Sequence, residues 1–399
     1  MTKWLQQYIA LVLRIGRAIR ERTGETLYDY YGDKQLEEQI EKEELLSGEV
    51  LLFEALALAE DLPGQGFEGH RRLYLDKQLT ALEMVCRRLC GAKFALKEEA
   101  RRYFGLDVEW IPEAVFEEAL SIYDKALPGR GDIRKRLARH RKKYELSRGK
   151  ASLLPELMQQ AVKETRRRTG KLIGLPEEEQ TETLPITDKP VKAMAQYMGN
   201  YKSAIMVNTG LPFYLPELLS VASHEGYPGH IAEIVLKEEY LIKRKGYLEQ
   251  QVGFQLTPPF VISEGIALLA MQSVFDRGEA ELWMNGNIYP GLGLEADSSD
   301  LPAIQKATDL LRGAWCNAAL LLDEGRTISE AVRYITKNTL HTEKQAGYAV
   351  KSLQRPFCEA YIFTYYYGRK LLEPILSGPR KQEKLKELLT EQTCISDLL

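Results

Sequence analysis

Apolar residues recur at helical spacing along most of the chain. Between Arg71 and Leu96, six apolar side chains fall on one stripe, as on the buried face of an α-helix: Leu75, Leu79, Leu82, Val85, Cys86 and Leu89. Similar stretches cover residues 1–60, 112–126, 154–170, 301–322 and 327–339. The pattern therefore predicts a mainly α-helical protein.

Only one segment alternates convincingly in the manner of a β-strand. From Ser203 to Asn208, successive side chains face opposite ways, and the turn residues Thr209–Pro212 follow. We therefore expect a small antiparallel strand or hairpin element near residues 201–212. Its free edge could pair with an extended peptide, and a purely structural hairpin fits the pattern equally well.

A long break in the helical pattern lies between residues 174 and 190, which hold three prolines and the run Glu177–Glu179. Such composition is typical of a loop between larger units. We place the division at residue 185, between an N-terminal helical half (1–185) and a second half (186–399). We expect both halves to belong to one continuous fold that encloses a central cleft.

Composition narrows the class of protein further. With 44% hydrophobic residues, 28% charged residues and a net charge of −3, the chain is typical of a soluble globular protein without general attraction for nucleic acid or membrane. No apolar run approaches the roughly 18 residues of a membrane span, and Trp4–Ile15 is interrupted too often for a signal peptide. Five scattered cysteines fit free thiols in a reducing cytoplasm. We predict a cytoplasmic protein and leave its oligomeric state open.

The segment Asp132–Arg148 is strongly basic and includes His140. It is either an anion-binding face or a solvated helix surface. We favour the second interpretation, because the sequence lacks a nucleic-acid fold signature and interleaved aromatic residues. A nucleic-acid partner is therefore not expected.

The candidate chemistry is concentrated in residues 224–230, His-Glu-Gly-Tyr-Pro-Gly-His. Two of the chain's five histidines and a glutamate fall within this stretch. Neutral imidazoles bind Zn²⁺, and a glutamate beside them can take a proton from metal-bound water. The common H-E-x-x-H motif places both histidines on one helix face. On a straight helix, His224 and His230 would instead be about 9 Å apart along the axis and roughly 120° apart around it.

Pro228 and Gly229 offer a way to remove this obstacle. Proline has no N–H, and its ring clashes with the carbonyl of His224, so a helix must kink or break there. Glycine tolerates whatever backbone the break requires. We predict that Pro228 and Gly229 bulge out and bring His230 beside His224 on one metal ion. A kinked helix with two unrelated histidines is the alternative.

Glu264 is predicted as the third metal ligand from its surroundings. It is the only charge in the apolar segment that follows Pro258-Pro259, and it lies 34 residues after His230. A carboxylate buried alone costs several kcal/mol, so it should be protonated, paired or bound to a metal. Pairing with an arginine is the alternative.

The motif resembles the H-E-x-x-P-G-H-H signature of a large family catalogued as domain of unknown function 885. The similarity extends to Tyr201–Pro212 and Ser263–Gly265, and more weakly to Phe104-Gly105, Leu127–Gly129, Arg355-Pro356 and Tyr361. It thus covers most of the chain. The sequence departs from the family at Ile231, where the family has a second histidine, and at Ile266, where an aromatic residue is frequent. His230 is therefore the one candidate for the second imidazole.

That family is similar to helical zinc peptidases related to thermostable carboxypeptidases and angiotensin-converting enzyme. The resemblance implies a large helical metallopeptidase-like fold with a central cleft. It implies one Zn²⁺ ion held by His224, His230 and Glu264, with Glu225 as general base. It also implies short peptides or peptide ends as substrates.

Further residues are candidates for binding the substrate. Peptidases of the resembled kind place a tyrosine near the zinc to hold the oxyanion, and Tyr361 or Tyr365, which share a helix face, would suit this role. We also predict substrate contacts from Asn208, Arg355 and His341, with Arg355 as a bidentate clamp for a carboxylate. Aromatic packing and ordinary structural roles are the alternatives.

The sequence thus predicts a zinc-dependent metallopeptidase, carboxypeptidase-like, that cleaves peptides by Glu-assisted attack of metal-bound water. Two other functions stay open. One is a zinc hydrolase of a non-peptide amide or ester, which would use the same residues. The other is a non-catalytic helical binding protein with a degenerate metal motif, which Ile231 favours.

Overall fold

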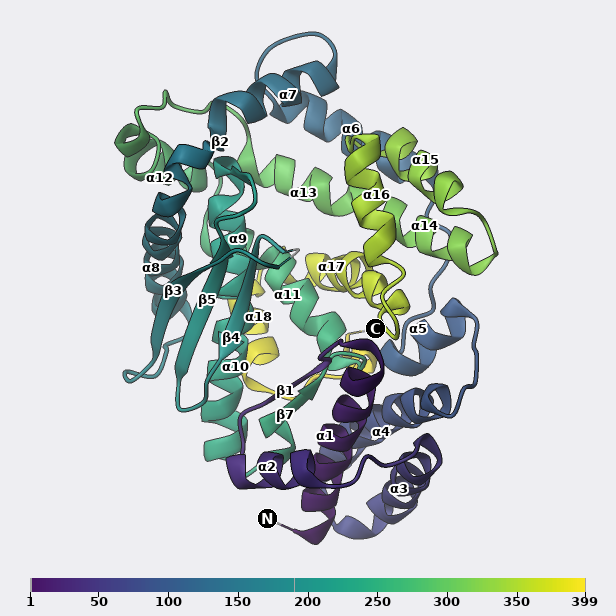
Figure 1. Cartoon of the computed structure of the whole chain (residues 1–399). Helices are drawn as coiled ribbons and strands as arrows, with labels where there is room; N and C mark the ends of the chain where they lie inside the picture. Colours follow the sequence, from purple (N-terminus) through teal and green to yellow (C-terminus); the bar gives the residue numbers. More distant parts are fainter. Residues whose placement is uncertain (1, 190, 399) are drawn as a thin grey trace.

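A computed structural model describes residues 2–189 and 191–398, and these are mainly α-helical, as predicted (Figure 1). The helices are α1 (Lys3–Thr23), α2 (Lys34–Lys42), α3 (Gly48–Asp61), α4 (Gly69–Leu89), α5 (Leu96–Phe104), α6 (Glu113–Ala126), α7 (Ile133–Tyr144), α8 (Leu154–Leu172), α9 (Leu218–Glu225), α10 (His230–Lys237), α11 (Pro259–Val274), α12 (Glu279–Asn287), α13 (Leu301–Leu311), α14 (Gly313–Asp323), α15 (Ile328–Asn338), α16 (Glu343–Ser352), α17 (Ile362–Leu376) and α18 (Lys381–Thr390). The strands are β1 (Tyr28–Tyr30), β2 (Glu145–Leu146), β3 (Gln180–Ile186), β4 (Ala193–Tyr197), β5 (Lys202–Asn208), β6 (Phe213–Tyr214) and β7 (Val252–Phe254).

Helix α4 shows how the apolar pattern determines local structure. All six residues of the predicted stripe are buried, because they face the neighbouring helices of the core. The Glu68 side chain accepts a hydrogen bond from the N–H of Arg71 and caps the first turn. The helix ends at Leu89 and not at Leu96 as expected, because Gly91 takes the left-handed conformation with φ of 93°.

The strand element is larger than the predicted hairpin. Strand β5 is the middle of a three-stranded mixed sheet, paired in parallel with β3 and antiparallel with β4. Both edges of β5 are therefore occupied, and the expectation that it offers a free edge to a peptide is wrong. Strand β3 lies in the segment expected to be a loop, so the sheet takes strands from both sides of residue 185.

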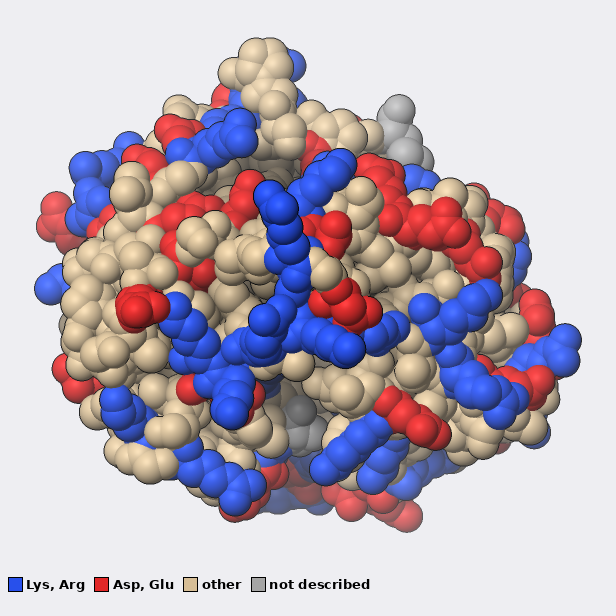
Figure 2. All heavy atoms as spheres, turned by 90° about the horizontal axis from the view of Figure 1, so that it is seen from above, with Lys and Arg blue, Asp and Glu red and all other residues tan. Residues whose placement is uncertain are grey.

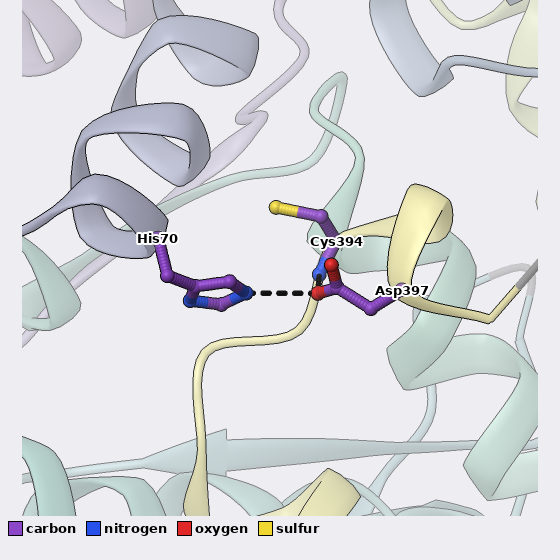
Figure 3. Close-up of side chains that lie close together, drawn as sticks. All are labelled: His70, Cys394 and Asp397. Atoms are coloured by element: carbon purple, nitrogen blue, oxygen red, sulfur yellow. Dashed lines mark hydrogen bonds and ion pairs between the residues drawn. The ribbon is translucent and has the colours of Figure 1, made fainter.

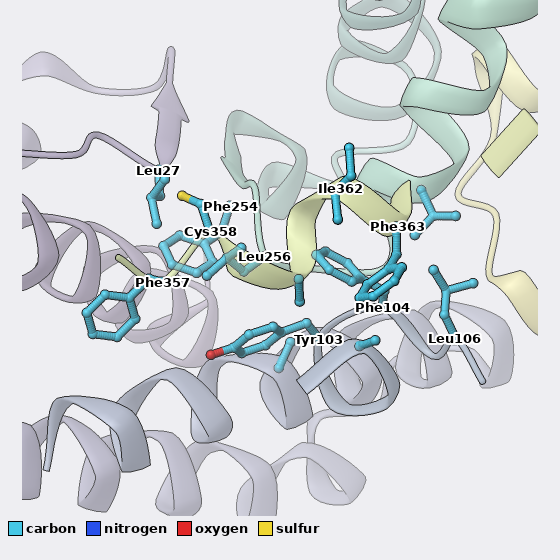
Figure 4. Packing of buried hydrophobic residues seen from close by; sticks show 14 of the residues in the cluster. Leu27, Tyr103, Phe104, Leu106, Phe254, Leu256, Phe357, Cys358, Ile362 and Phe363 are labelled. Atoms are coloured by element: carbon cyan, nitrogen blue, oxygen red, sulfur yellow. The ribbon is translucent and has the colours of Figure 1, made fainter. Parts of the chain in front are cut away.

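The largest apolar cluster joins segments from both ends of the chain. Figure 4 shows Tyr103 and Phe104 of α5 close to Ile362 and Phe363 of α17, with Phe254 of β7 nearby. This packing fixes α17 against the N-terminal helices. The start of α17 is consequently a rigid support for the tyrosines that precede and follow it.

Helices α11 and α17 approach each other unusually closely at two glycines. A Cβ atom on Gly265 would lie 2.6 Å from the carbonyl oxygen of Gly368, and one on Gly368 would lie 2.3 Å from that of Val261. Any larger residue would force the backbones apart. The contact holds Glu264, the neighbour of Gly265, against the tyrosine face of α17.

Among the described residues, no single helix combines the length and the apolar composition of a membrane span. Only the bent pair Pro259–Val274 and Glu279–Leu292 meets those two criteria jointly, with a bend of 78°.

Candidate metal site

The helix that carries the histidine motif is interrupted between Glu225 and His230, as predicted. The N–H of Gly229 donates to the carbonyl of Ser223 (2.9 Å), and the N–H of Ala232 donates to that of Gly226 (3.1 Å). Each bond spans six residues instead of the four of an α-helix. Two residues are thus looped out of the ladder. His230 therefore takes the place that a residue four positions after His224 would have on a regular helix.

Glycine at position 229 is required by close packing. A Cβ atom there would lie 2.0 Å from the carbonyl oxygen of His224 and 2.4 Å from that of Ser223. The requirement for glycine therefore follows from these two steric contacts.

The three predicted ligands come together at this break. The Nε2 atoms of His224 and His230 lie 3.5 and 3.9 Å from Oε2 of Glu264, and one ligand atom from each residue lies within 4.8 Å of the others. Atoms bound at about 2.0–2.1 Å to one tetrahedral ion are roughly 3.3–3.4 Å apart. The arrangement is thus slightly wider than a metal-bound set and needs only small side-chain adjustments to become one.

Glu264 provides the test of whether these residues fit a metal ion. It is 4% exposed, and its Oε1 accepts a hydrogen bond from the Tyr361 hydroxyl (2.7 Å). Its Oε2 is buried without a hydrogen-bond partner among the described residues, and its ion-pair partners there are the two imidazoles, not an arginine. A buried acceptor left in this state is costly unless a cation or proton satisfies it. Two imidazole nitrogens and a carboxylate oxygen are a ligand set that suits Zn²⁺.

The two imidazoles differ in how their surroundings affect them. Oγ of Ser263 lies 3.1 Å from Nδ1 of His230, which leaves Nε2 directed at Glu264. Burial, and then the neighbouring His230, hold the pKa of His224 well below its usual value, so this ring stays neutral. Burial also acts to lower the pKa of His230, but the charges of Glu264 and Glu225 outweigh it and raise that pKa above the usual value.

Glu225 lies beside the three ligands and contacts the sheet. Its Oε2 accepts a hydrogen bond from the N–H of Ala195 on β4 (2.9 Å). Burial, together with the charge of Glu264, raises the pKa of Glu225 above its ordinary value. A raised pKa brings a carboxylate closer to what a general base near neutral pH requires.

Strand β4 presents a backbone edge on the side of Glu225. The backbone groups of its even-numbered residues face β5. The N–H of Asn208 donates to the carbonyl of Lys192, and the N–H of Met198 donates to the carbonyl of Lys202. In an antiparallel pair the alternate residues point away. The backbone N–H and C=O groups that point away from β5 therefore belong to the odd-numbered residues. Among them, the N–H of Ala195 donates to Glu225.

Both predicted tyrosines lie at the site. Tyr361 donates to Glu264, and its ring meets that of Tyr365 edge-on at 5.7 Å between centroids. Burial, and then the charge of Glu264, raise the pKa values of both phenols well above the usual value. Both hydroxyls therefore remain protonated hydrogen-bond donors at neutral pH.

Asn208 has a structural role instead of the predicted role in substrate binding. It is 1% exposed, and its Nδ2 donates to the carbonyls of Lys189 and Val191. Its Oδ1 accepts from the N–H of Gly210. The side-chain amide is fully used in closing the loop around the end of β5, so no group is left for a ligand.

Arg355 likewise has a partner that the sequence does not suggest. Its guanidinium makes a two-pronged ion pair with Glu25, with Nε 3.0 Å from Oε1. The predicted carboxylate clamp is thus occupied by a carboxylate of the chain itself.

His341 lies between α15 and α16, where its Nδ1 is 2.9 Å from Oγ1 of Thr339 and its ring meets Trp315 edge-on. Burial, and then the positive charges of Arg141 and Arg312, lower the pKa of His341 to about 4. It contacts none of the three ligands among the interactions of the described residues. Its predicted contact with substrate stays untested.

The lowered pKa of His341 predicts a loss of stability in acid. An unfolded histidine takes up its proton near pH 6.5, whereas the folded ring stays neutral down to about pH 4. Between these values the unfolded state binds more protons, so stability falls as pH falls. We expect the free energy of unfolding of the wild type, relative to His341→Gln, to drop by about 3 kcal/mol between pH 7 and pH 4. Urea denaturation across this range measures it, and parallel curves for the two proteins would contradict it.

His140 is buried and not on the solvated surface expected for it. Its Nε2 lies 2.9 Å from Oδ1 of Asp297, and its Nδ1 bonds the Tyr214 hydroxyl. The other basic side chains of α7 are mostly exposed. The face seen in Figure 2 carries basic side chains with acidic ones between them.

A second group of possible metal ligands consists of His70, Cys394 and Asp397 (Figure 3). Here the carboxylate already has hydrogen-bond partners within the group. Oδ2 of Asp397 lies 2.9 Å from Nε2 of His70 and also accepts from the N–H of Cys394. Burial raises the pKa of the Cys394 thiol to about 11, so the thiol is protonated at neutral pH. The His224 site differs because its carboxylate oxygen lacks such a partner.

Two charged residues near the imidazoles were not singled out from the sequence. The charge of Asp29 on β1 acts on His230, and the charge of Arg312, between α13 and α14, acts on His224. Both lie far from the motif along the chain, and no local pattern marks them.

No protein-family model matches the chain, and no curated protein does. The family resemblance therefore stays a prediction that rests on the motif residues. Among solved structures, a candidate lipoprotein from Colwellia psychrerythraea is similar with a TM-score of 0.55 and 15% identity, over 89% of this chain and 69% of that one. A candidate lipoprotein of unknown function from Shewanella oneidensis gives 0.49 and 11%, over 88% and 72%. At these identities the likeness to the first protein concerns the fold alone.

Proposed function

We propose that this protein is a zinc-dependent metallopeptidase that acts on short peptides or peptide ends. The observation that carries the proposal is the buried Oε2 of Glu264, which has no hydrogen-bond partner among the described residues and faces two imidazole nitrogens. A divalent cation satisfies all three atoms at once. His224, His230 and Glu264 would hold the ion, and three protein ligands leave a position open, as catalytic zinc sites require.

Zinc, when bound, would polarise the scissile carbonyl and lower the pKa of a water ligand. The proton of the attacking water passes to Glu225, whose Oε2 is held by Ala195 so that Oε1 is left to receive it. The water oxygen bonds to the carbonyl carbon, and the C–N bond breaks. Glu225 then gives its proton to the leaving nitrogen, so a carboxylic acid and an amine result, and the acid loses its remaining proton to solvent. The protonated phenol of Tyr365 would donate to the carbonyl oxygen as negative charge develops, and Tyr361 would do so only on giving up its hydrogen bond to Glu264.

A peptide backbone is the substrate that the surroundings favour. The outward edge of β4 runs beside Glu225 and is paired with no other strand among the described residues, although its N–H at Ala195 is bonded to Glu225. An extended peptide can add to such an edge through main-chain hydrogen bonds, irrespective of its side chains. We therefore assign peptide pairing to β4 and not to β5, for which the sequence predicted it.

Zinc binding tests the proposal most directly. We expect protein purified without a histidine tag to bind one zinc ion per chain. Glu264→Gln should weaken binding by more than the roughly 10- to 100-fold that loss of an outer-shell partner costs. Glutamine keeps the side chain's size and its acceptor for Tyr361, so the fold is conserved.

Cys394→Ser is the control, because it alters the second ligand group and should leave zinc affinity unchanged. Metal analysis and titration with a zinc chelator provide the measurement. A chain that binds no zinc, or a Glu264→Gln variant that binds it as tightly as the wild type, would refute the site.

A further inference from the structure

Arg312 lies one layer beyond the tyrosines of the candidate site. Its guanidinium carbon is 5.1 Å from the ring centroid of Tyr365. Tyr365 in turn meets Tyr361, the hydrogen-bond donor to Glu264. A group bound to this guanidinium would therefore be separated from the metal ligands by little more than an aromatic ring.

The charge of Arg312 is compensated by a carboxylate that it shares with a second arginine. The nearest carboxylate belongs to Asp309, which is fully buried and pairs through Oδ2 with Arg369 (2.8 Å). Oδ1 of Asp309 accepts from Gln305 at 2.9 Å, whereas Nε of Arg312 lies 3.5 Å away, beyond ordinary hydrogen-bond length. Nε of Arg312 has no hydrogen-bond partner among the described residues.

The guanidinium is nevertheless open to a ligand. Its side chain is 31% exposed, so it lies neither deep in the core nor fully in solvent. A partly buried cation that shares its counter-charge with a second arginine binds an anion more strongly than a surface lysine does, because less water screens the pair.

Further positive charge surrounds this position. Arg141 lies over the ring of Tyr214 at 5.3 Å, and its buried Nε also has no hydrogen-bond partner among the described residues. The charges of Arg141 and Arg312 both act on His341, which lies between α15 and α16. Lys192 also acts on His341 but is neutralised by Glu217, whereas Arg134 adds a further positive charge. Three arginines thus contribute positive charge around His341.

We propose that Arg312 binds a carboxylate group of the peptide substrate. A planar guanidinium matches a carboxylate through two parallel hydrogen bonds. The inference rests on the proposed peptidase function and adds a substrate class to it, namely peptides with a carboxylate close to the cleaved bond. Such a carboxylate belongs either to the free C-terminus or to an acidic side chain.

Peptide binding to zinc-loaded Glu225→Gln protein tests this without turnover. Calorimetry would compare one short neutral peptide as the free acid, the same peptide as the C-terminal amide, and an amide that ends in aspartate. We expect the free acid to bind about 10- to 100-fold more tightly than the neutral amide, the range of a charge-assisted pair. Tight binding of the aspartate amide would identify a side-chain carboxylate as sufficient. Equal affinity for acid and neutral amide, or binding of none of the three, would overturn the inference.

Substitutions show which residue causes the preference for the free acid over the amide. In the same Glu225→Gln background, Arg312→Met should abolish the difference between acid and amide, and Arg312→Lys, which keeps the charge but not the planar fork, should retain part of it. Arg139→Met makes the same chemical change on the exposed surface of α7 and should leave the difference intact. A preference that survives Arg312→Met would refute the assignment.

Hydrolysis by the wild type separates this inference from the proposed function. Cleavage of acid and amide peptides at equal rates would support the peptidase and overturn the Arg312 site. An acid preference in binding without any cleavage would uphold the site and refute the peptidase.

Discussion

Replacing Glu225 with glutamine is expected to lower kcat/KM for peptide hydrolysis by about 10²- to 10⁴-fold, the usual contribution of a general base. Glutamine has the size of glutamate, and its amide oxygen can still accept the hydrogen bond from Ala195. The side chain should therefore stay in place and lose only its capacity to take a proton. Because Glu225 is not among the three ligands, zinc content should remain that of the wild type.

The same experiment distinguishes the proposed peptidase from its alternatives. Glu178→Gln, an exposed glutamate on the loop before β3, removes the same charge and should leave activity unchanged. Assays with peptides, non-peptide amides and esters would show whether the wild type prefers peptides. Full peptidase activity in Glu225→Gln would refute the mechanism. Activity on esters alone would favour a non-peptide hydrolase, and no activity on any substrate would favour a binding protein.

Parts of the site could be predicted because their physical causes are local. A proline and a glycine that follow a histidine determine how a helix can continue, whatever surrounds them. The break between Glu225 and His230 follows from those two residues. Glu264 could be predicted because a single charge within an apolar helix needs a partner wherever the helix packs.

The three-stranded sheet could be predicted only in its central strand. The two outer strands have polar or mixed sequences, such as Gln-Thr-Glu-Thr at the start of β3, and Pro185 lies near its end. These residues form strands because β5 supplies hydrogen-bonding edges on both sides. Pairing of this kind depends on tertiary structure and leaves little trace in the apolar pattern.

The substrate-binding residues were the hardest to predict. Asn208 and Arg355 have the right chemistry, but the fold uses both for itself. Arg355 is paired with Glu25 from the opposite end of the chain, which no local pattern could reveal. Arg312 could not be predicted for the converse reason, because it is notable only for sharing the counter-charge of Asp309 with Arg369. Charge compensation is a property of the assembled fold and not of any segment.

Replacing Gly229 with alanine tests whether the loop-out itself builds the metal site. The added methyl group would lie 2.0 and 2.4 Å from two backbone carbonyl oxygens, and neither can move without breaking the end of α9. We expect the free energy of unfolding to fall by about 2–4 kcal/mol, as for other severe steric insertions into packed structure. Zinc affinity should fall as well, because any shift that relieves the clash moves His230 away from His224.

Gly347→Ala on α16 is the matched control for this variant. An added methyl group meets no atom within 4 Å there, and the residue lies inside a regular helix. Alanine should therefore stabilise the protein slightly, by about 0.5–1 kcal/mol. Denaturation with and without zinc separates the two consequences for Gly229→Ala. If that variant lost stability but kept its zinc affinity, the two imidazoles would not depend on the loop-out for their meeting. If the variant kept both its stability and its zinc affinity, the predicted steric clash at Gly229 would be refuted. The spacing of six residues between the histidines would then need another explanation.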